Sequence, residues 1–133
     1  MKTVFVDTSG FYAAMDNADS FHSAAASLFR KAVTDGWSLV TTNYVLHESW
    51  ALIQRRLGIE AVADFARGVL RLCQVVFVDS ALHEAAVQRC LAAKRRQLSL
   101  TDCVSIEWMQ PRKITEAIAW DVHFTEAGIK LPS

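Results

Sequence analysis

The sequence contains no long apolar run, and this absence excludes an integral membrane protein of the helical kind. No stretch approaches the roughly 20 consecutive apolar residues that a membrane-spanning helix requires. The opening segment, residues 1–7 (MKTVFVD), is also unlike a secretory signal, because its apolar stretch is short and an acid follows directly. We therefore expect a soluble cytoplasmic protein that has no contact with a membrane.

Cysteine, proline and glycine are scarce as well. The chain has three cysteines, two prolines and five glycines. Three cysteines cannot all pair, and no Cys-x-x-Cys is present, which argues against a disulfide framework or a zinc knuckle. Cys73, Cys90 and Cys103 are therefore expected to be small buried side chains in a reducing compartment. Because no linker or low-complexity tract divides the chain, residues 1–133 are predicted to form a single domain.

An excess of charge of either sign is also missing. Fourteen basic and fourteen acidic residues give a formal net charge of zero. The whole molecule is therefore not a polycation attracted to nucleic acid by its overall field, which argues against a packaging protein. A nuclease is not excluded, since an acidic active site needs only local basic neighbours. The hydrophobic fraction of 52% is enough for a substantial core.

What the sequence does contain is an alternation of short apolar runs with longer amphipathic segments. Runs that are apolar nearly throughout are typical of parallel strands covered on both faces. Strands separated by helices imply right-handed parallel crossovers. The pattern thus predicts an α/β fold, a three-layer α/β/α sandwich with a central, mainly parallel sheet. The expected strands are 3–6, 38–41, 75–78 and 117–120, and the expected helices are 20–34, 43–57, 59–72, 80–96 and 101–109.

Four acids fall at related places in this pattern. Asp7 and Asp121 each follow a predicted strand directly. Glu48 lies in the first turns of the helix after the second strand, and Asp102 begins the last helix. Ligand sites of open α/β sheets lie outside the carboxyl ends of the strands. Each acid also has apolar neighbours in sequence, where a carboxylate is costly unless it is compensated. We therefore expect the four side chains to converge.

Converging carboxylates point to a divalent cation. All four would be ionised at neutral pH with ordinary pKa values near ~4, and they would repel one another. Mg²⁺ or Mn²⁺ resolves this conflict, because both prefer oxygen ligands and retain several waters. Such a site can activate water against a phosphodiester and leave a 5′-phosphate and a 3′-hydroxyl. The predicted metal ligands and catalytic residues are Asp7, Glu48, Asp102 and Asp121.

Structural explanations exist for single members of this set. Asp7 could cap a helix that starts at Thr8. Asp102 could stand at the start of its helix because a negative charge there interacts favourably with the helix dipole. Glu48 is the hardest to explain in this way, because the residues around it form an apolar pattern. His47-Glu48 begins like the zinc-protease motif His-Glu-x-x-His, but position 51 is Ala. The histidines show no metal-ligand spacing, although His123 is close enough to Asp121 to contact a substrate.

Basic and aromatic residues offer further contacts to nucleic acid. Lys94, Arg95 and Arg96 precede the third acid and could bind RNA phosphates, or they could simply be a solvated helix end that suits the dipole. Arg55-Arg56 could bind RNA or the acidic groups of a protein partner. The four tryptophans could stack on bases, although core packing explains most tryptophans better.

The same acids stand in motifs that resemble those of a known family. These motifs are Val6-Asp7-Thr8-Ser9, Thr42-Asn43-Tyr44-Val45-Leu46-His47-Glu48, Ser99-Leu100-Thr101-Asp102-Cys103 and Ala119-Trp120-Asp121-Val122-His123-Phe124. In this order they resemble the four acidic motifs of PIN domains, especially of the VapC-type toxins of bacterial toxin–antitoxin pairs. The resemblance covers nearly the whole chain. Trp120 departs from it mildly, since Phe is commoner before the fourth acid.

The resemblance implies a PIN fold and RNA cleavage that depends on Mg²⁺ or Mn²⁺. It also implies a homodimer and a cognate antitoxin protein as partners. The hydroxyl residue beside the first acid often supports the metal in this family, a role that maps to Thr8 or Ser9 here. Two alternatives stay open at this point. One is a housekeeping RNA-processing nuclease, and the other is a non-catalytic α/β interaction module whose acids cap helices or bind a structural cation.

Overall fold

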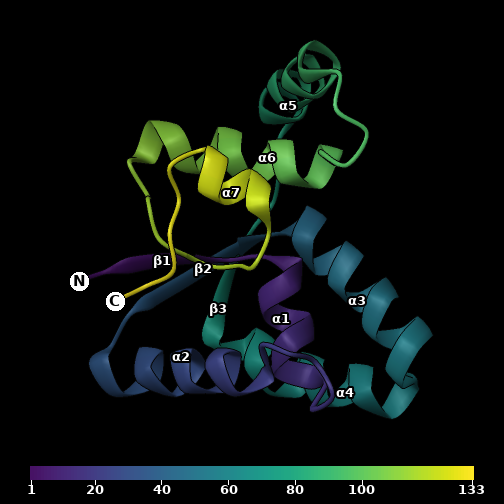
Figure 1. Ribbon diagram of the computed structural model, residues 1–133, viewed down its shortest axis with the longest axis vertical. Helices are drawn as coiled ribbons and strands as arrows, with labels where there is room; N and C mark the ends of the chain where they lie inside the picture. Colours follow the sequence, from purple (N-terminus) through teal and green to yellow (C-terminus); the bar gives the residue numbers. More distant parts are fainter.

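A four-stranded parallel sheet lies at the centre of the computed structural model, which describes residues 1–133 (Figure 1). Its strands stand in the order β3-β2-β1-β4, and every pair is parallel. Phe5 of β1 lies opposite Val40 of β2 on one side and Ala117 of β4 on the other. The predicted parallel α/β architecture is thus confirmed. The strands are β1 (Thr3–Val6), β2 (Ser38–Thr42), β3 (Cys73–Val76) and β4 (Ala117–Ile118).

Helices cover both faces of this sheet, as Figure 1 shows. One layer contains α1 (Thr8–Met15), α2 (His22–Asp35), α3 (Asn43–Leu57) and α4 (Ile59–Arg67). The other contains α5 (Ser80–Ala93), α6 (Leu100–Met109) and α7 (Val122–Glu126), with α5 packed on α6 at the top of the view. Two short 3₁₀ turns, η1 (Val69–Leu72) and η2 (Gln110–Arg112), complete the chain. No helix is long and apolar enough to cross a membrane.

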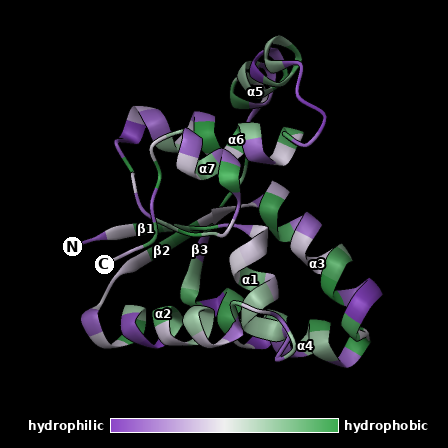
Figure 2. Ribbon diagram, in the orientation of Figure 1, coloured by the Kyte–Doolittle hydropathy of each residue, from purple (hydrophilic) through white to green (hydrophobic).

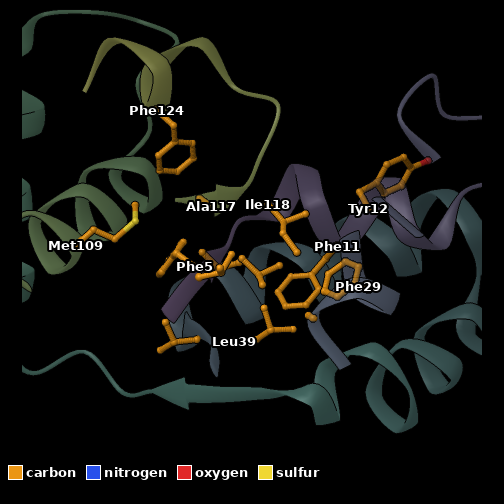
Figure 3. Packing of buried hydrophobic residues seen from close by; sticks show 14 of the residues in the cluster. Phe5, Phe11, Tyr12, Phe29, Leu39, Met109, Ala117, Ile118 and Phe124 are labelled. Carbon is orange, nitrogen blue, oxygen red and sulfur yellow. The ribbon is translucent and has the colours of Figure 1, made fainter. Parts of the chain in front are cut away.

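The core fills the space between the sheet and its two helical layers. Figure 2 shows green, apolar segments on the strands and alternating apolar and hydrophilic segments along the helices. Phe5 and Ile118 lie in the sheet, with Phe124 and Met109 on one side and Phe11 on the other (Figure 3). These side chains are buried, and burial of each large apolar side chain contributes about 1.5–3 kcal/mol. The sheet is consequently held rigidly from both faces.

Gly10 allows α1 to lie unusually close to β4. A Cβ atom at this position would stand 2.2 Å from the carbonyl oxygen of Ile118, a distance that no side chain tolerates. The backbone N–H of Asp7 donates to the same carbonyl at 3.2 Å. The buried hydroxyl of Thr41 also donates to the carbonyl of Val6, at 2.8 Å. The carboxyl end of β1 is therefore fixed between β2 and β4, directly before the first acid.

The third strand differs from its predicted position by two residues. The apolar run predicted 75–78, whereas β3 pairs from Cys73 to Val76. The strand stops because the side chain of Asn43 accepts a hydrogen bond from the backbone N–H of Val78, at 2.8 Å. Phe77 then points outward and is 75% exposed. A side chain 35 positions away in the sequence thus ends the strand, and local periodicity does not contain that information.

Several helix limits also differ from the prediction. The expected helix 59–72 is broken at Gly68, which separates α4 from η1. The expected helix 80–96 ends at Ala93, because Lys94 adopts the left-handed backbone conformation. Helix α7 was not predicted, because it is short, and α1 was considered only as a helix that Asp7 could cap. The three cysteines are free as expected, but only Cys103 is fully buried, whereas Cys73 and Cys90 are partly exposed.

Candidate metal centre

One cleft of about 440 Å³ contains all four acids singled out by the sequence. Asp7 ends β1, Asp121 follows β4, Asp102 lies in the first turn of α6, and Glu48 projects from α3. The cleft therefore lies at the carboxyl edge of the sheet, where parallel α/β folds bind their ligands. Its lining also includes Thr8, Ser9, Tyr12, Asp19, Phe21, Leu52, Gln97, Ser99 and Trp120.

Asp7 is the most deeply buried of the four acids. Its Oδ2 atom caps α1 by accepting hydrogen bonds from the backbone N–H of Ser9 at 3.3 Å and from the hydroxyl of Ser9 at 2.9 Å. Burial, reinforced by the nearby charge of Asp102, raises the pKa of Asp7 to about 7. An ionised Asp7 is thus destabilised in this cleft unless a positive charge joins it.

Asp102 stands in a reciprocal capping box at the start of α6. Its backbone N–H donates to the hydroxyl of Ser99 at 3.0 Å, and its Oδ2 accepts from the backbone N–H of Ser99 at 3.1 Å. Burial raises the pKa of Asp102, the charge of Asp121 adds to this rise, and the hydrogen bonds from Ser99 oppose it. The box fixes the side chain with its carboxylate toward the other acids.

Asp121 caps the short helix α7. Its Oδ1 accepts a hydrogen bond from the backbone N–H of His123 at 2.8 Å, and its side chain is 30% exposed. The ring of His123 is buried beside it, with Nδ1 2.7 Å from Asp121 Oδ1 and 3.7 Å from Asp102 Oδ2. This nitrogen has no hydrogen bond of acceptable geometry. Ligand atoms of Asp102, Asp121 and His123 lie within 4.8 Å of one another.

The position of His123 corrects the sequence-based interpretation of the histidines. The sequence showed no metal-ligand spacing among the histidines, and His123 was expected at most to contact a substrate beside Asp121. The fold nevertheless places its ring against two of the acids. The Asp121-x-His123 spacing at the start of a short helix could have indicated this contact. At that spacing, the backbone N–H and the ring of His123 both lie close to the carboxylate of Asp121, which caps the helix.

Glu48 differs from the other three acids because it is exposed to solvent. The apolar residues around it in sequence belong to other faces of α3, and Val45, Ser49 and Ile53 are the ones that turn inward. The argument from the cost of burial therefore fails for Glu48. Its side chain still lines the same cleft as Asp7 and Asp102. The four acids therefore share one cleft, and their role as metal ligands stays a prediction.

Hydrogen bonds to the three aspartates leave half of each carboxylate free. Asp7 and Asp102 accept through Oδ2, whereas Asp121 accepts through Oδ1. The second oxygen of each accepts no hydrogen bond from the protein. The capping role and the metal role are consequently compatible, since one oxygen orients the side chain while the other remains available. Hard oxygen donors of this kind suit a divalent cation such as Mg²⁺ or Mn²⁺.

The two hydroxyl residues beside Asp7 have different surroundings. Ser9 donates to Asp7 Oδ2 and accepts from the backbone N–H of Trp120 at 2.9 Å, so it joins the first acid to the segment that precedes the fourth. Thr8 is buried, and its hydroxyl has no partner in the protein. Of the two, Ser9 is the residue that fixes the geometry of the acids.

The basic residues predicted to bind RNA differ in whether the protein already pairs their charges. Arg95 forms a bidentate ion pair with Glu126, with contacts of 2.9 and 3.0 Å, while Lys94 and Arg96 are exposed without an ion pair. Arg56 lies over the ring of Tyr12. Arg55 lines a second cavity of about 850 Å³, which adjoins the acidic cleft because both include Glu48 and Leu52.

A parallel α/β/α sandwich with a cleft of this composition defines the class of the protein. The PIN domain profile matches residues 4–130, and the chain belongs to the PIN domain family. It is 36% identical over 129 residues to the 23S rRNA-specific endonuclease VapC20 in two strains of Mycobacterium tuberculosis, with 94% of each chain covered. The crystal structure of that species' VapC20, a sarcin–ricin loop cleaving toxin, has a TM-score of 0.83 and 30% identity over 95% of each chain.

These similarities confirm the family that the four motifs indicated. They also confirm that the chain is an enzyme of the nuclease class. The alternative of a non-catalytic interaction module is thereby overturned, although its premise was correct in part, because three of the acids do cap helices.

Proposed function

We propose that this chain is an endoribonuclease that hydrolyses RNA in the cleft formed by Asp7, Glu48, Asp102 and Asp121. The observation that carries the proposal is the convergence of four carboxylates from distant parts of the chain, three of which keep one oxygen free. A cluster that burial makes unfavourable persists in a folded protein when it serves a ligand. The nuclease class of the chain agrees with this assignment.

The metal proposed for the cleft is Mg²⁺ or Mn²⁺. Bound between these carboxylates, it would lower the pKa of a water molecule and offset the charge of the scissile phosphate. Asp7, Asp102 and Asp121 would hold it with the oxygens that accept no hydrogen bond. Glu48, which is exposed and lines the same cleft, would complete the ligand set. Attack by water gives a 5′-phosphate and a 3′-hydroxyl, and it does not use the 2′-hydroxyl of RNA.

The proposed substrate is structured RNA, and specifically a loop of 23S ribosomal RNA. This assignment rests on the substrates named for the VapC20 relatives, which are 36% identical to the chain over 129 residues. Lys94 and Arg96 follow α5, are exposed and form no ion pair. They lie close in sequence to Gln97, which lines the cleft. They would bind phosphates next to the cleavage site, and Arg55 would bind a more distant one along the adjoining cavity.

The proposed biological role is that of the toxin in a toxin–antitoxin pair, acting in the cytoplasm as a homodimer with a cognate antitoxin protein as inhibitor. The support is the VapC20 relationship over nearly the whole chain. Exposed apolar residues such as Trp50 and Phe77 offer surface for such partners. No observation favours the housekeeping alternative over this role.

Cleavage of purified ribosomes tests the proposed function. The protein is incubated with intact ribosomes and with protein-free 23S rRNA, in Mn²⁺ or Mg²⁺ and again in excess EDTA, and the ends are mapped by primer extension. The proposal requires one dominant, metal-dependent cut that leaves a 5′-phosphate. Cuts that persist at the same rate after chelation would contradict the metal mechanism. Metal-dependent cleavage of other RNAs, with 23S rRNA left intact, would contradict the substrate.

A further inference from the structure

Two aromatic rings stack on each other at the rim of the acidic cleft. Phe21 precedes α2 and Trp120 follows β4, and their ring centroids lie 5.0 Å apart with an interplanar angle of 11°. Both side chains line the same cleft as the four acids. Although Trp120 covers one face of the phenyl ring, Phe21 remains 45% exposed. An apolar ring is thus presented to solvent at the entrance of a strongly polar cavity.

Hydrogen bonds fix the backbone positions of the two aromatic residues. The backbone N–H of Trp120 donates to Ser9 Oγ, which in turn donates to Asp7. The backbone N–H of Phe21 donates to Oδ1 of Asp19 at 2.8 Å, and Asp19 also lines the cleft. Trp120 is therefore tied to Asp7 through Ser9, and Phe21 is placed beside the acids by its stacking on Trp120.

We infer that the Phe21–Trp120 pair is a stacking platform for one nucleobase next to the scissile phosphate; this inference rests on the proposed function of the cleft. Every base has a π-face, so an exposed aromatic face beside a phosphate site suits single-stranded RNA. The platform contributes affinity and positions the strand, but it does not select the base, because stacking tolerates all four.

The surroundings of the pair favour a nucleotide over an apolar protein segment. Nine of the 13 residues that line the cleft are polar or charged, and the four acids are among them. An apolar helix placed here would have to cover those carboxylates without compensating them. A nucleotide places its base on the rings and its phosphate toward the metal-bound acids, which satisfies both parts of the cleft.

Replacement of the aromatic ring by an aliphatic side chain tests this inference. Phe21→Leu retains apolar bulk and removes the π-face, whereas Phe21→Tyr retains the face. Phe77→Leu is the matched control, because Phe77 is also an exposed phenylalanine but lies outside the cleft. The probe is a fluorescent stem-loop RNA with the sarcin–ricin loop of 23S rRNA, and its dissociation constant is measured by anisotropy with Ca²⁺ in place of the catalytic metal.

A stacked base predicts an RNA dissociation constant about tenfold higher for Phe21→Leu. Phe21→Tyr and Phe77→Leu should bind like the parent. A series of probes, each with one loop nucleotide made abasic, provides a second measurement that needs no variant. At one position the abasic probe should bind the parent about tenfold more weakly, and Phe21→Leu should add no further loss there.

Two results would overturn the inference. One is an unchanged dissociation constant for Phe21→Leu, and the other is a Phe21→Leu loss that is the same for every abasic probe. A change in dimer mass for Phe21→Leu with unaltered RNA binding would assign the rings to a protein contact instead. Cleavage by the parent in Mn²⁺ is scored separately, so that a failure of the stacking platform is distinguished from a failure of the proposed ribonuclease activity.

Discussion

Ser9 connects the first acid of the cleft to a residue 111 positions later. Its hydroxyl accepts a hydrogen bond from the backbone N–H of Trp120 at 2.9 Å and donates one to Asp7 Oδ2 at the same distance. Asp7 ends β1 and Asp121 follows Trp120, so this single hydroxyl sets the separation of two acids that no common element carries. The acids are consequently positioned by a small hydrogen-bonded network at the edge of the sheet.

Replacement of Ser9 by alanine should therefore weaken both stability and catalysis. The backbone N–H of Trp120 would lose its partner, at a cost of about 1–3 kcal/mol. The pKa of Asp7 should rise further, because the hydrogen bond from Ser9 lowers it. Chemical denaturation and single-turnover cleavage measure the two effects. Ser27→Ala, at an exposed position of α2, is the matched control. Equal unfolding free energies for both variants would contradict this role of Ser9.

The metal-free protein should lose stability as the pH rises from about 4 to about 7. Unfolded Asp7 gives up its proton near its ordinary pKa of 3.8, whereas folded Asp7 retains it until about 7. The folded state therefore binds this proton more tightly, and the benefit is present in full below pH 4 and lost above 7. At 1.36 kcal/mol per pH unit, the loss is on the order of 4 kcal/mol.

Asp7→Asn isolates this contribution, because asparagine does not titrate and the other groups largely cancel in the comparison. The difference in unfolding free energy between parent and variant, measured in EDTA across this pH range, should change in favour of the variant as pH rises. Asp64→Asn, at an exposed site on α4, should leave the profile of the parent unchanged. Parallel profiles for parent and Asp7→Asn would show that burial of Asp7 does not raise its pKa.

His123 should support metal binding through the two aspartates that it touches. Its Nδ1 atom is 2.7 Å from Asp121 and 3.7 Å from Asp102. His123→Phe keeps a planar ring in this buried place and removes the nitrogen. Loss of a group that contacts metal ligands typically lowers metal affinity about 10–100-fold. Calorimetric titration with Mn²⁺ measures the change, with His47→Phe as the exposed control. Parent-like affinity in His123→Phe would mean that the ring is only a packing element.

Much of the fold could be predicted from sequence because it depends on local periodicity. The parallel sheet follows from short apolar runs separated by amphipathic helices, and the four acids follow from their places after strands and at helix starts. The end of β3 could not be found in this way, since the side chain of Asn43 determines it. The length of helix α1 could not be predicted for a similar reason, although Asp7 indicated its start. Its eight residues depend on the cap from Asp7 and on the close contact of Gly10 with β4.

The details of the site were less accessible to sequence reasoning. Asp102 is part of a capping box, and the Ser99-x-x-Asp102 spacing could have indicated it. No local signal places Phe21 against Trp120, because the pair forms between segments 99 residues apart. Exposure of Glu48 was also misjudged, since neighbours in sequence on a helix point in different directions. Most of the features that the sequence pattern did not predict depend on contacts between segments that are distant in the sequence.

The most direct measurement of the central claim is a comparison of parent, Asp7→Asn and Asp64→Asn in Mn²⁺. Asn keeps the size of Asp7 and caps a helix nearly as well, so a purely structural role predicts little change. A metal ligand predicts a fall in RNA cleavage beyond the roughly 10–100-fold cost of losing a supporting group. At ten times its dissociation constant, the metal should stabilise the parent by about 1.4 kcal/mol, and thereby raise its Tm by about 2–8 °C. This rise should persist in Asp64→Asn and vanish in Asp7→Asn. Full cleavage by Asp7→Asn, with the parent's response to Mn²⁺, would contradict the account.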